Sequence, residues 1–117
     1  MNIASIIESY ITSYNQFNVD EMLSFFQPNC IFENLSNSAE NIQIVGIETL
    51  RNFAEMGIDI FKERKQEVLK LNIGTNHAVV EIRFEGVLKE ENKKVQIRGV
   101  SIFEFENGKI SRLADYS

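Results

Sequence analysis

Three charged residues in the second half of the chain have the types and spacing to carry out proton-transfer chemistry. Arg83 and Glu85 lie two residues apart in a strand-like segment, and Asp115 closes the last such segment. Side chains two apart on a strand share one face, so Arg83 and Glu85 must point the same way. If they point inward, an arginine between two carboxylates forms an acid-base device. If they point outward, they form a surface ion pair that contributes little to stability.

The first half of the chain has the apolar spacing of helices, which would support these residues from one side. Apolar residues recur at helical intervals over residues 3–17 and again over residues 19–26. Gly46 opens a third helix, which Gly57 is expected to interrupt. Residues 58–64 are expected to add a further helical turn or two.

From Gln66 onward the apolar period changes to two, which is typical of strands. The expected strands cover residues 67–73, 79–88, 95–105 and 110–116. Two shorter extended pieces, at 30–34 and 42–45, precede them, with the polar run 36–41 as a loop between the two. The pair Asn107 and Gly108 predicts a tight hairpin, because both residues tolerate positive φ. Residues 1–117 are therefore expected to form one α+β domain, with three helices packed on one face of a curved, mainly antiparallel sheet.

Composition excludes several classes of function. The net charge of −5 argues against nucleic acid as a partner, because binding phosphates requires a basic surface. Cys30 is the lone cysteine and His77 the lone histidine, so neither an internal disulfide nor a clustered metal site is expected. No apolar run is long enough to span a bilayer, and no signal peptide is visible. We expect a cytoplasmic protein that uses no cofactor and does not bind membranes.

Five features of the chain carry a resemblance to a known group of proteins. They are the segments 6–10, 18–22 and 26–34, Gly46, and the terminal hairpin 100–110. In their order they resemble the nuclear transport factor 2-like superfamily, also called the SnoaL-like or ketosteroid isomerase-like fold, over essentially the whole chain. The resemblance implies a cone-shaped domain. It does not give the activity, because the superfamily holds isomerases, cyclases, hydrolases, dehydratases and non-catalytic binders on one scaffold.

Ketosteroid isomerase is one member with which the site positions can be compared. Its mechanism needs a base Asp and an oxyanion hole made of a Tyr and a protonated Asp. Tyr10 matches the tyrosine, whereas the base falls at Asn34 and the second oxyanion donor at Ser101. An amide cannot accept the proton, so steroid isomerisation by that mechanism is not expected.

Limonene epoxide hydrolase has the more similar site pattern. The resemblance matches its Arg-x-Asp pair to Arg83 and Glu85, its last-strand Asp to Asp115, and its early Tyr-x-Asn pair to Phe32 and Asn34. It implies that Asp115 acts as general base on a water that Asn34 also holds. Glu85 would protonate the leaving oxygen, and Arg83 would orient both carboxylates. Glu85 is one methylene longer than the family's Asp, and Phe32 lacks the family's hydroxyl.

The remaining expectations concern the ligand pocket and the oligomer. The pocket is expected to be apolar and to include Tyr10, Tyr14, Phe32, Ser101 and Phe103.

Ile82 and Phe84 form the apolar face of the strand that carries Arg83 and Glu85. If the two charged residues point into a pocket, Ile82 and Phe84 must be covered by something else, and we expect a homodimer interface on the outer face of the sheet.

These observations favour a small homodimeric enzyme that uses acid-base chemistry on a small hydrophobic molecule. Epoxide hydration is one version, and isomerase- or cyclase-like chemistry is another. The alternative is a non-catalytic ligand-binding or dimerisation module. The directions of Arg83, Glu85, Asp115 and Asn34 discriminate these possibilities, because catalysis requires them to converge in one pocket.

Overall fold

The computed structural model describes residues 1–36 and 40–117. Residues 37–39, which belong to the loop expected at 36–41, lie outside the described residues. The helices are α1 (Ile3–Asn15), α2 (Val19–Ser24) and α3 (Ile47–Ile60), with one short 3-10 turn, η1 (Glu90–Asn92). The strands are β1 (Phe26–Leu35), β2 (Ile42–Val45), β3 (Phe61–Ile73), β4 (His77–Leu88), β5 (Lys94–Glu106) and β6 (Lys109–Tyr116).

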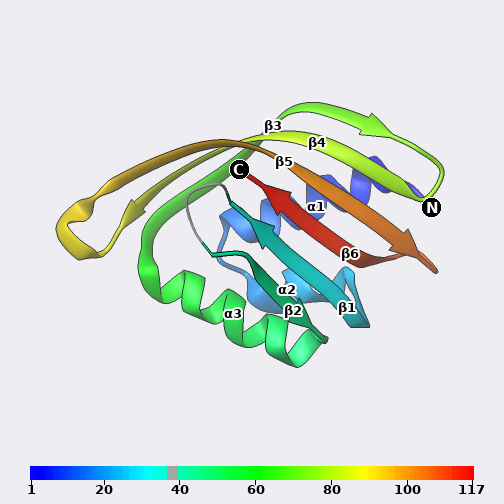
Figure 1. Ribbon diagram of the computed structural model, residues 1–117, viewed down its shortest axis with the longest axis horizontal. Coiled ribbons are helices and arrows are strands. Elements are labelled where there is room, and N and C mark those ends of the chain that lie inside the picture. Colours follow the sequence, from blue (N-terminus) through cyan, green and yellow to red (C-terminus); the bar gives the residue numbers. More distant parts are fainter. Residues whose placement is uncertain (37–39) are drawn as a thin grey trace.

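The six strands form a single curved sheet in the order β2-β1-β6-β5-β4-β3. β1 and β6 run parallel, and the other neighbouring pairs are antiparallel. The helices cover one face of the sheet, with α1 packed against β3 and α3 against β1 and β2 (Figure 1). This is the predicted α+β architecture.

The two N-terminal helices begin at asparagine caps, which explains where the sequence starts them. The Asn2 side chain accepts a hydrogen bond from the Ser5 amide. The Asn18 side chain accepts one from the Glu21 amide and donates another to the Glu21 carboxylate, and such bonds satisfy amides that have no partner within the helix.

The prediction that Gly57 interrupts the third helix is wrong, and so is the helical assignment of residues 61–64, whereas residues 58–60 are helical as expected. α3 continues through Gly57 to Ile60, and β3 begins at Phe61. The reason is tertiary pairing, since Arg64 lies opposite Gly86 and Gln66 opposite Phe84 along the β3–β4 ladder. Because alternate residues of a strand share a face, this early start turns Arg64 and Gln66 towards the helices.

The core lies between the helices and the inner face of the sheet. Its largest fully buried side chains are those of Phe103, Ile7, Ile110, Leu113 and Val80. The core does not fill the whole space between the helices and the sheet. Among the described helices, none has the length and apolarity needed to cross a membrane.

Candidate functional site

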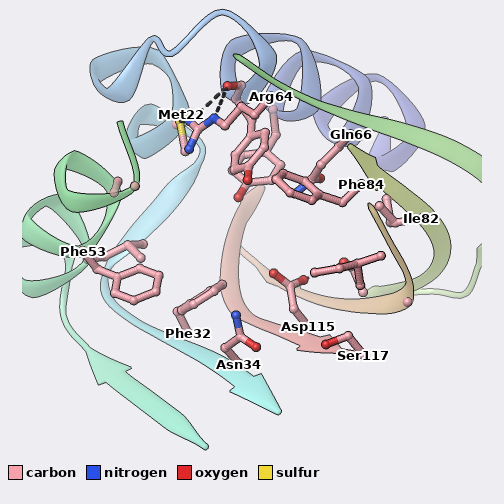
Figure 2. Close-up of a pocket in the computed structure, with 18 of the residues that line it drawn as sticks. Met22, Phe32, Asn34, Phe53, Arg64, Gln66, Ile82, Phe84, Asp115 and Ser117 are labelled. Atoms are coloured by element: carbon pink, nitrogen blue, oxygen red, sulfur yellow. Dashed lines mark hydrogen bonds between the residues drawn. The ribbon is translucent and has the colours of Figure 1, made fainter. Parts of the chain in front are cut away.

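A cavity of about 340 Å³ lies between the helices and the concave face of the sheet (Figure 2). Its walls are mostly apolar and come from all three helices and from five of the six strands. The aromatic and aliphatic side chains that line it include those of Tyr10, Tyr14, Phe32, Phe53, Phe61, Ile82 and Phe84. Apolar walls with a few polar groups are typical of small-molecule sites.

Asp115 is the polar group that most changes the chemistry of this cavity. It lies on β6, opposite Asn34 of β1 and Ser101 of β5, so the three residues share the inner face of adjacent strands. The Ser101 hydroxyl donates a hydrogen bond to Asp115 Oδ1 at 2.6 Å. Burial raises the pKa of Asp115 to about 6, although the bond from Ser101 acts in the opposite direction. A carboxylate with such a pKa can exchange protons near neutral pH.

Two tyrosines of α1 lie in the same cavity. Tyr10 is buried against Phe26 and Phe103, with edge-to-face rings whose centroids are 5.6 Å and 5.9 Å away. Burial raises the pKa of Tyr10, and the charge of Asp115 raises it further. Burial also raises the pKa of Tyr14, where the nearby Arg64 guanidinium acts in the opposite direction. Both phenols therefore stay protonated and can donate hydrogen bonds.

Arg64 projects from β3 into the cavity and lies against α1. Arg64 is only 8% exposed. Nε and Nη2 donate to the backbone carbonyl of Tyr14 at 3.2 Å and 3.0 Å. The guanidinium carbon lies 3.7 Å from the Tyr14 ring centroid and 4.6 Å from that of Phe17. Burial lowers the pKa of Arg64, but an arginine remains charged in proteins.

The expectation that Arg83 and Glu85 face this cavity is wrong. Both lie on the outer face of β4, where Arg83 Nη1 is 3.7 Å from Glu67 Oε1 and Glu85 accepts a hydrogen bond from Gln96. The period of two decides this placement, because Ile82 and Phe84 on the same strand line the cavity. The roles expected for Arg83 and Glu85 in moving protons at Asp115 have no geometric basis.

The same alternation corrects the expected homodimer interface. Ile82 is only 6% exposed, and the Phe84 ring packs edge-on against Phe61 and Tyr14 with centroids 5.4 Å and 6.5 Å away. These two side chains are covered by the protein's own helices and by β3. They are not available to a partner subunit.

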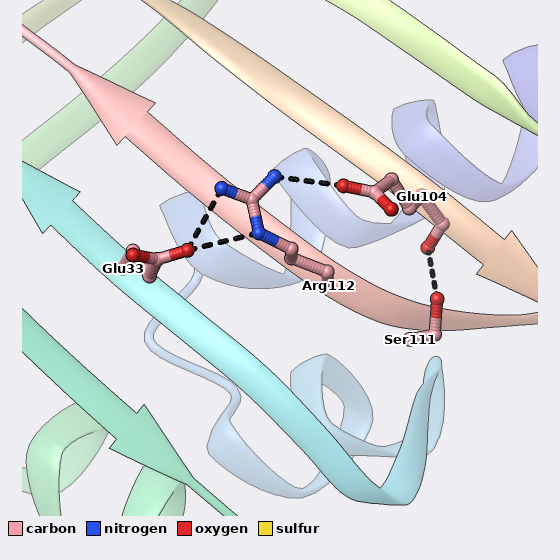
Figure 3. A network of polar contacts seen from close by, with 4 residues as sticks. All are labelled: Glu33, Glu104, Ser111 and Arg112. Carbon is pink, nitrogen blue, oxygen red and sulfur yellow. Dashed lines mark hydrogen bonds and ion pairs between the residues drawn. The ribbon is translucent and has the colours of Figure 1, made fainter.

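The outer face of the sheet instead carries ion pairs (Figure 3). Arg112 on β6 donates to Glu33 Oε1 through Nε at 2.9 Å and lies 2.7 Å from it through Nη2. Its Nη1 donates to Glu104 on β5 at 2.7 Å. These three side chains connect β1, β6 and β5 across the face opposite the cavity.

Residues 7–113 match the family model described as the SnoaL-like domain. The chain belongs to the SnoaL-like domain family. No match was found among curated proteins.

Several solved structures resemble this SnoaL-like domain. A protein with a ketosteroid isomerase-like fold from Catenulispora acidiphila is 12% identical, with a TM-score of 0.87 over 99% of this chain and 87% of that one. An LEH-like epoxide hydrolase of M. tuberculosis is 13% identical, with a TM-score of 0.80 over 96% of this chain and 79% of that one. A protein provisionally named a polyketide cyclase, from Xanthomonas campestris, is 16% identical, with a TM-score of 0.74 over 97% and 88%. These likenesses establish the predicted fold and leave the activity open.

The cavity of this SnoaL-like domain contains most of the residues that sequence reasoning proposed. Those that line it are Asn34, Asp115, Tyr10, Tyr14, Phe32 and Ser101. Phe103 does not line it, because its ring is 1% exposed and is buried between Tyr10 and Phe105 in the core. Arg64 and Gln66 were missed, since residues 58–64 were assigned to a helix end. Extending the period of two back from Gln66 would have placed Arg64 on the inner face.

Proposed function

We propose that this SnoaL-like domain is a small-molecule enzyme in which Asp115 accepts and returns a proton within an apolar cavity. The observation that carries the proposal is the Asp115 carboxylate, which has a pKa of about 6 and is held by the Ser101 hydroxyl. General bases work best when their pKa lies near the working pH. Figure 2 shows Asp115 and Asn34 pointing into the same space, where a substrate would meet both.

Isomerase- or cyclase-like chemistry fits this arrangement better than epoxide hydration does. Among the described residues that line the cavity, Asp115 is the one side-chain carboxylate, and the expected second acid, Glu85, lies on the outer face. A single base suffices to remove a proton from a carbon next to a carbonyl. The neutral phenols of Tyr10 and Tyr14 are the donors available to the resulting enolate oxygen.

The proton and electron balance of such a step is simple. The C–H bond breaks, its proton goes to the Asp115 carboxylate, and its electron pair forms the enolate. In an isomerisation, protonated Asp115 returns that proton at a second carbon. In a cyclisation, the enolate carbon forms a bond to a second carbonyl, whose oxygen takes the proton.

The test is proton exchange at carbon, which requires no knowledge of the final product. Cyclic ketones and 1,3-diketones are incubated with the protein in D₂O, and NMR measures deuterium incorporation next to the carbonyl. Asp115→Asn is expected to lower the exchange rate by roughly a hundredfold or more. The wild-type rate should rise with pH through about 6 as Asp115 loses its proton.

Glu85→Gln is the matched control, because it removes a carboxylate from the outer face of the sheet. Its exchange rate is expected to equal that of the wild type. A panel of aryl epoxides forms a second arm of the assay. Epoxide opening that depends on Glu85 would support the hydration mechanism with two carboxylates. An exchange rate that is unaffected by Asp115→Asn would contradict the proposed enzyme and favour the non-catalytic binding module.

We also propose that the protein forms a homodimer, through contacts on the outer face of the sheet that do not include Ile82 and Phe84. The outer face carries the half-buried side chains of Val79, Val100 and Ile102, which lie side by side on β4 and β5. A second copy would cover them. Sedimentation equilibrium tests this directly, and a monomer at micromolar concentration would exclude it.

A further inference from the structure

We propose that the ligand of this cavity is an organic acid whose anionic oxygen binds Arg64, at the end of the cavity away from Asp115. Figure 2 shows Arg64 near α1 and α2 and Asp115 on the far side of the space beside Asn34, with Phe84 between them. The inference names a substrate class for the proposed enzyme and rests on that proposal only for the chemistry at Asp115. The binding of the acid stands on Arg64 alone.

The first observation is a buried charge without a counterion. Arg64 is 8% exposed, and over residues 1–36 and 40–117 no carboxylate lies within ion-pair distance of its guanidinium. The arginines that do form ion pairs, Arg51, Arg83 and Arg112, all have partly exposed side chains. The Tyr14 carbonyl and the rings of Tyr14 and Phe17 offset part of the cost of burying this charge, and an anion that arrives with the ligand would offset more of it.

The second observation is that the guanidinium is held in place by bonds from Nε and Nη2, to which Nη1 does not contribute. The backbone carbonyl of Tyr14 takes hydrogen bonds from Nε and Nη2, and Met22 Sδ lies 4.0 Å from Nη2. The Tyr14 side chain is also a hydrogen-bond partner of the Arg64 side chain. Among the described residues, Nη1 makes none of the bonds to the Tyr14 carbonyl or to Met22, which come from Nε and Nη2.

Gly57 leaves the space beside that nitrogen. A Cβ atom at position 57 would lie 3.2 Å from Arg64 Nη1, closer than such atoms normally approach. The glycine that was expected to break the third helix therefore has a different role in the structure. It lets α3 run past the guanidinium without displacing it.

The charges around Arg64 favour an anionic ligand. The titratable groups that act on it are Tyr14 and Tyr10, both neutral phenols. Asp115 would repel an acid, but Arg64 is not among the groups that move the pKa of Asp115, which is consistent with their separation. A cavity of about 340 Å³ suits a ring-containing acid whose carboxylate or acidic enol meets Arg64 while its reactive carbon lies near Asp115.

The test compares two probes that differ only in charge, 2-naphthoate and 2-naphthamide, by isothermal titration calorimetry at pH 7.5. The wild type is expected to bind the acid roughly tenfold or more tightly than the amide, because a hydrogen bond to a charged group contributes about 1.5–3 kcal/mol. Arg64→Met should abolish that preference while the amide still binds. Arg112→Met, the same substitution on the outer face, should keep it.

Gly57→Ala provides a second variant if Arg64→Met fails to fold, which circular dichroism will show. It keeps the charge but crowds Nη1, so the affinity for the acid should fall and that for the amide should not. Equal affinities in the wild type, no binding of either probe, or an acid preference that survives both substitutions would overturn the proposal.

Asp115→Asn separates this inference from the proposed function. The variant should bind 2-naphthoate at least as tightly as the wild type, because a repelling carboxylate is gone. Loss of acid binding in Asp115→Asn would contradict the assignment of the anion to Arg64. Deuterium exchange at carbon that does not depend on Asp115 would contradict the proposed enzymatic function. The proposal that Arg64 binds an acid would not be affected.

Discussion

Arg112 and Arg64 lie on opposite faces of the same sheet and have opposite surroundings. Arg112 lies between the carboxylates of Glu33 and Glu104, and these hydrogen bonds raise its pKa (Figure 3). Arg64 lies among aromatic rings and a backbone carbonyl, with no carboxylate beside it in the described parts of the chain, and burial lowers its pKa. The first arginine is neutralised by carboxylates of the protein, whereas the second has no such partner among the described residues.

A charged residue type alone therefore does not identify a site. Arg83 and Glu85 have the pattern of an acid-base pair, yet both make their contacts on the outer face. Asp115 and Arg64 come from segments far apart in the sequence, and both face the cavity. Charged side chains that line an apolar cavity and have no counterion in the protein are the better candidates for binding a ligand.

The largest difference in stability between the two faces of the sheet is expected for two neighbouring residues of β4, Ile82 and Arg83. Ile82→Ala should lower the free energy of unfolding by about 2–4 kcal/mol, because it removes buried methyl groups and leaves a hole. Arg83→Met should change it by less than about 0.5 kcal/mol, since the Arg83–Glu67 pair is exposed and 3.7 Å long. Urea denaturation of both variants measures the difference.

Sedimentation of the same two variants distinguishes core from interface. Ile82 lies inside the subunit, so the association state of Ile82→Ala should be that of the wild type. A shift towards smaller species, with little loss of stability, would instead support the dimer contact first expected at Ile82 and Phe84.

The second expected effect concerns Asp115 and depends on pH. Folding raises the pKa of Asp115 from 3.8 to about 6. At a pH between these two values, Asp115 is therefore mostly protonated in the folded state and mostly ionised in the unfolded state. This group therefore stabilises the protein below about pH 4, and that contribution is lost as the pH rises through 6. The loss amounts to roughly 2–3 kcal/mol.

Asp115→Asn should abolish this dependence. At pH 8 the variant should be more stable than the wild type by roughly 2–3 kcal/mol, and at pH 4 the two should be equal. Urea denaturation at both values measures this. Equal stabilities at pH 8 would mean that Asp115 is well hydrated and has an ordinary pKa, which would remove its advantage as a base.

A third and smaller loss of stability is expected for the ion pairs of Arg112 on the outer face. Arg112→Met should lower the free energy of unfolding by about 1–2 kcal/mol, because Glu33 and Glu104 lose their partner and face each other across β6. The loss should shrink at high salt, which screens the two carboxylates. Glu104→Gln in the Arg112→Met background should recover part of the loss, and no recovery would show that repulsion is not its cause.

The fold was predictable from the sequence because its signals are local. The helical spacing of apolar residues after Asn18, the change of apolar period after Gln66 and the Asn107–Gly108 hairpin are three such signals, and the structure contains the elements that they predict. The start of β3 was not predictable in this way. Residues 61–66 become a strand because β4 offers a partner edge, and such pairing depends on residues about twenty positions later.

The site was predictable in part. The resemblance pointed to Asp115, Asn34 and Ser101, and the structure places all three along the cavity on adjacent strands. The same resemblance put Arg83 and Glu85 one residue out of phase with the cavity. The plain alternation of Val80, Ile82 and Phe84 gives the correct faces, because a strand with one buried side turns its apolar residues inward.

The placement of β6 has a consequence for the order of folding. This strand follows all the others in the chain, yet it lies between β1 and β5, so Phe26 must pair with Ile110 and Asn34 with Asp115. Contacts between residues so distant in sequence form slowly, because a long loop must close before they stabilise anything. Until β6 inserts, β1 presents an unpaired edge and Asp115 is a hydrated carboxylate with ordinary acidity. The burial that raises the pKa of Asp115 therefore depends on the pairing of β6 with β1 and β5.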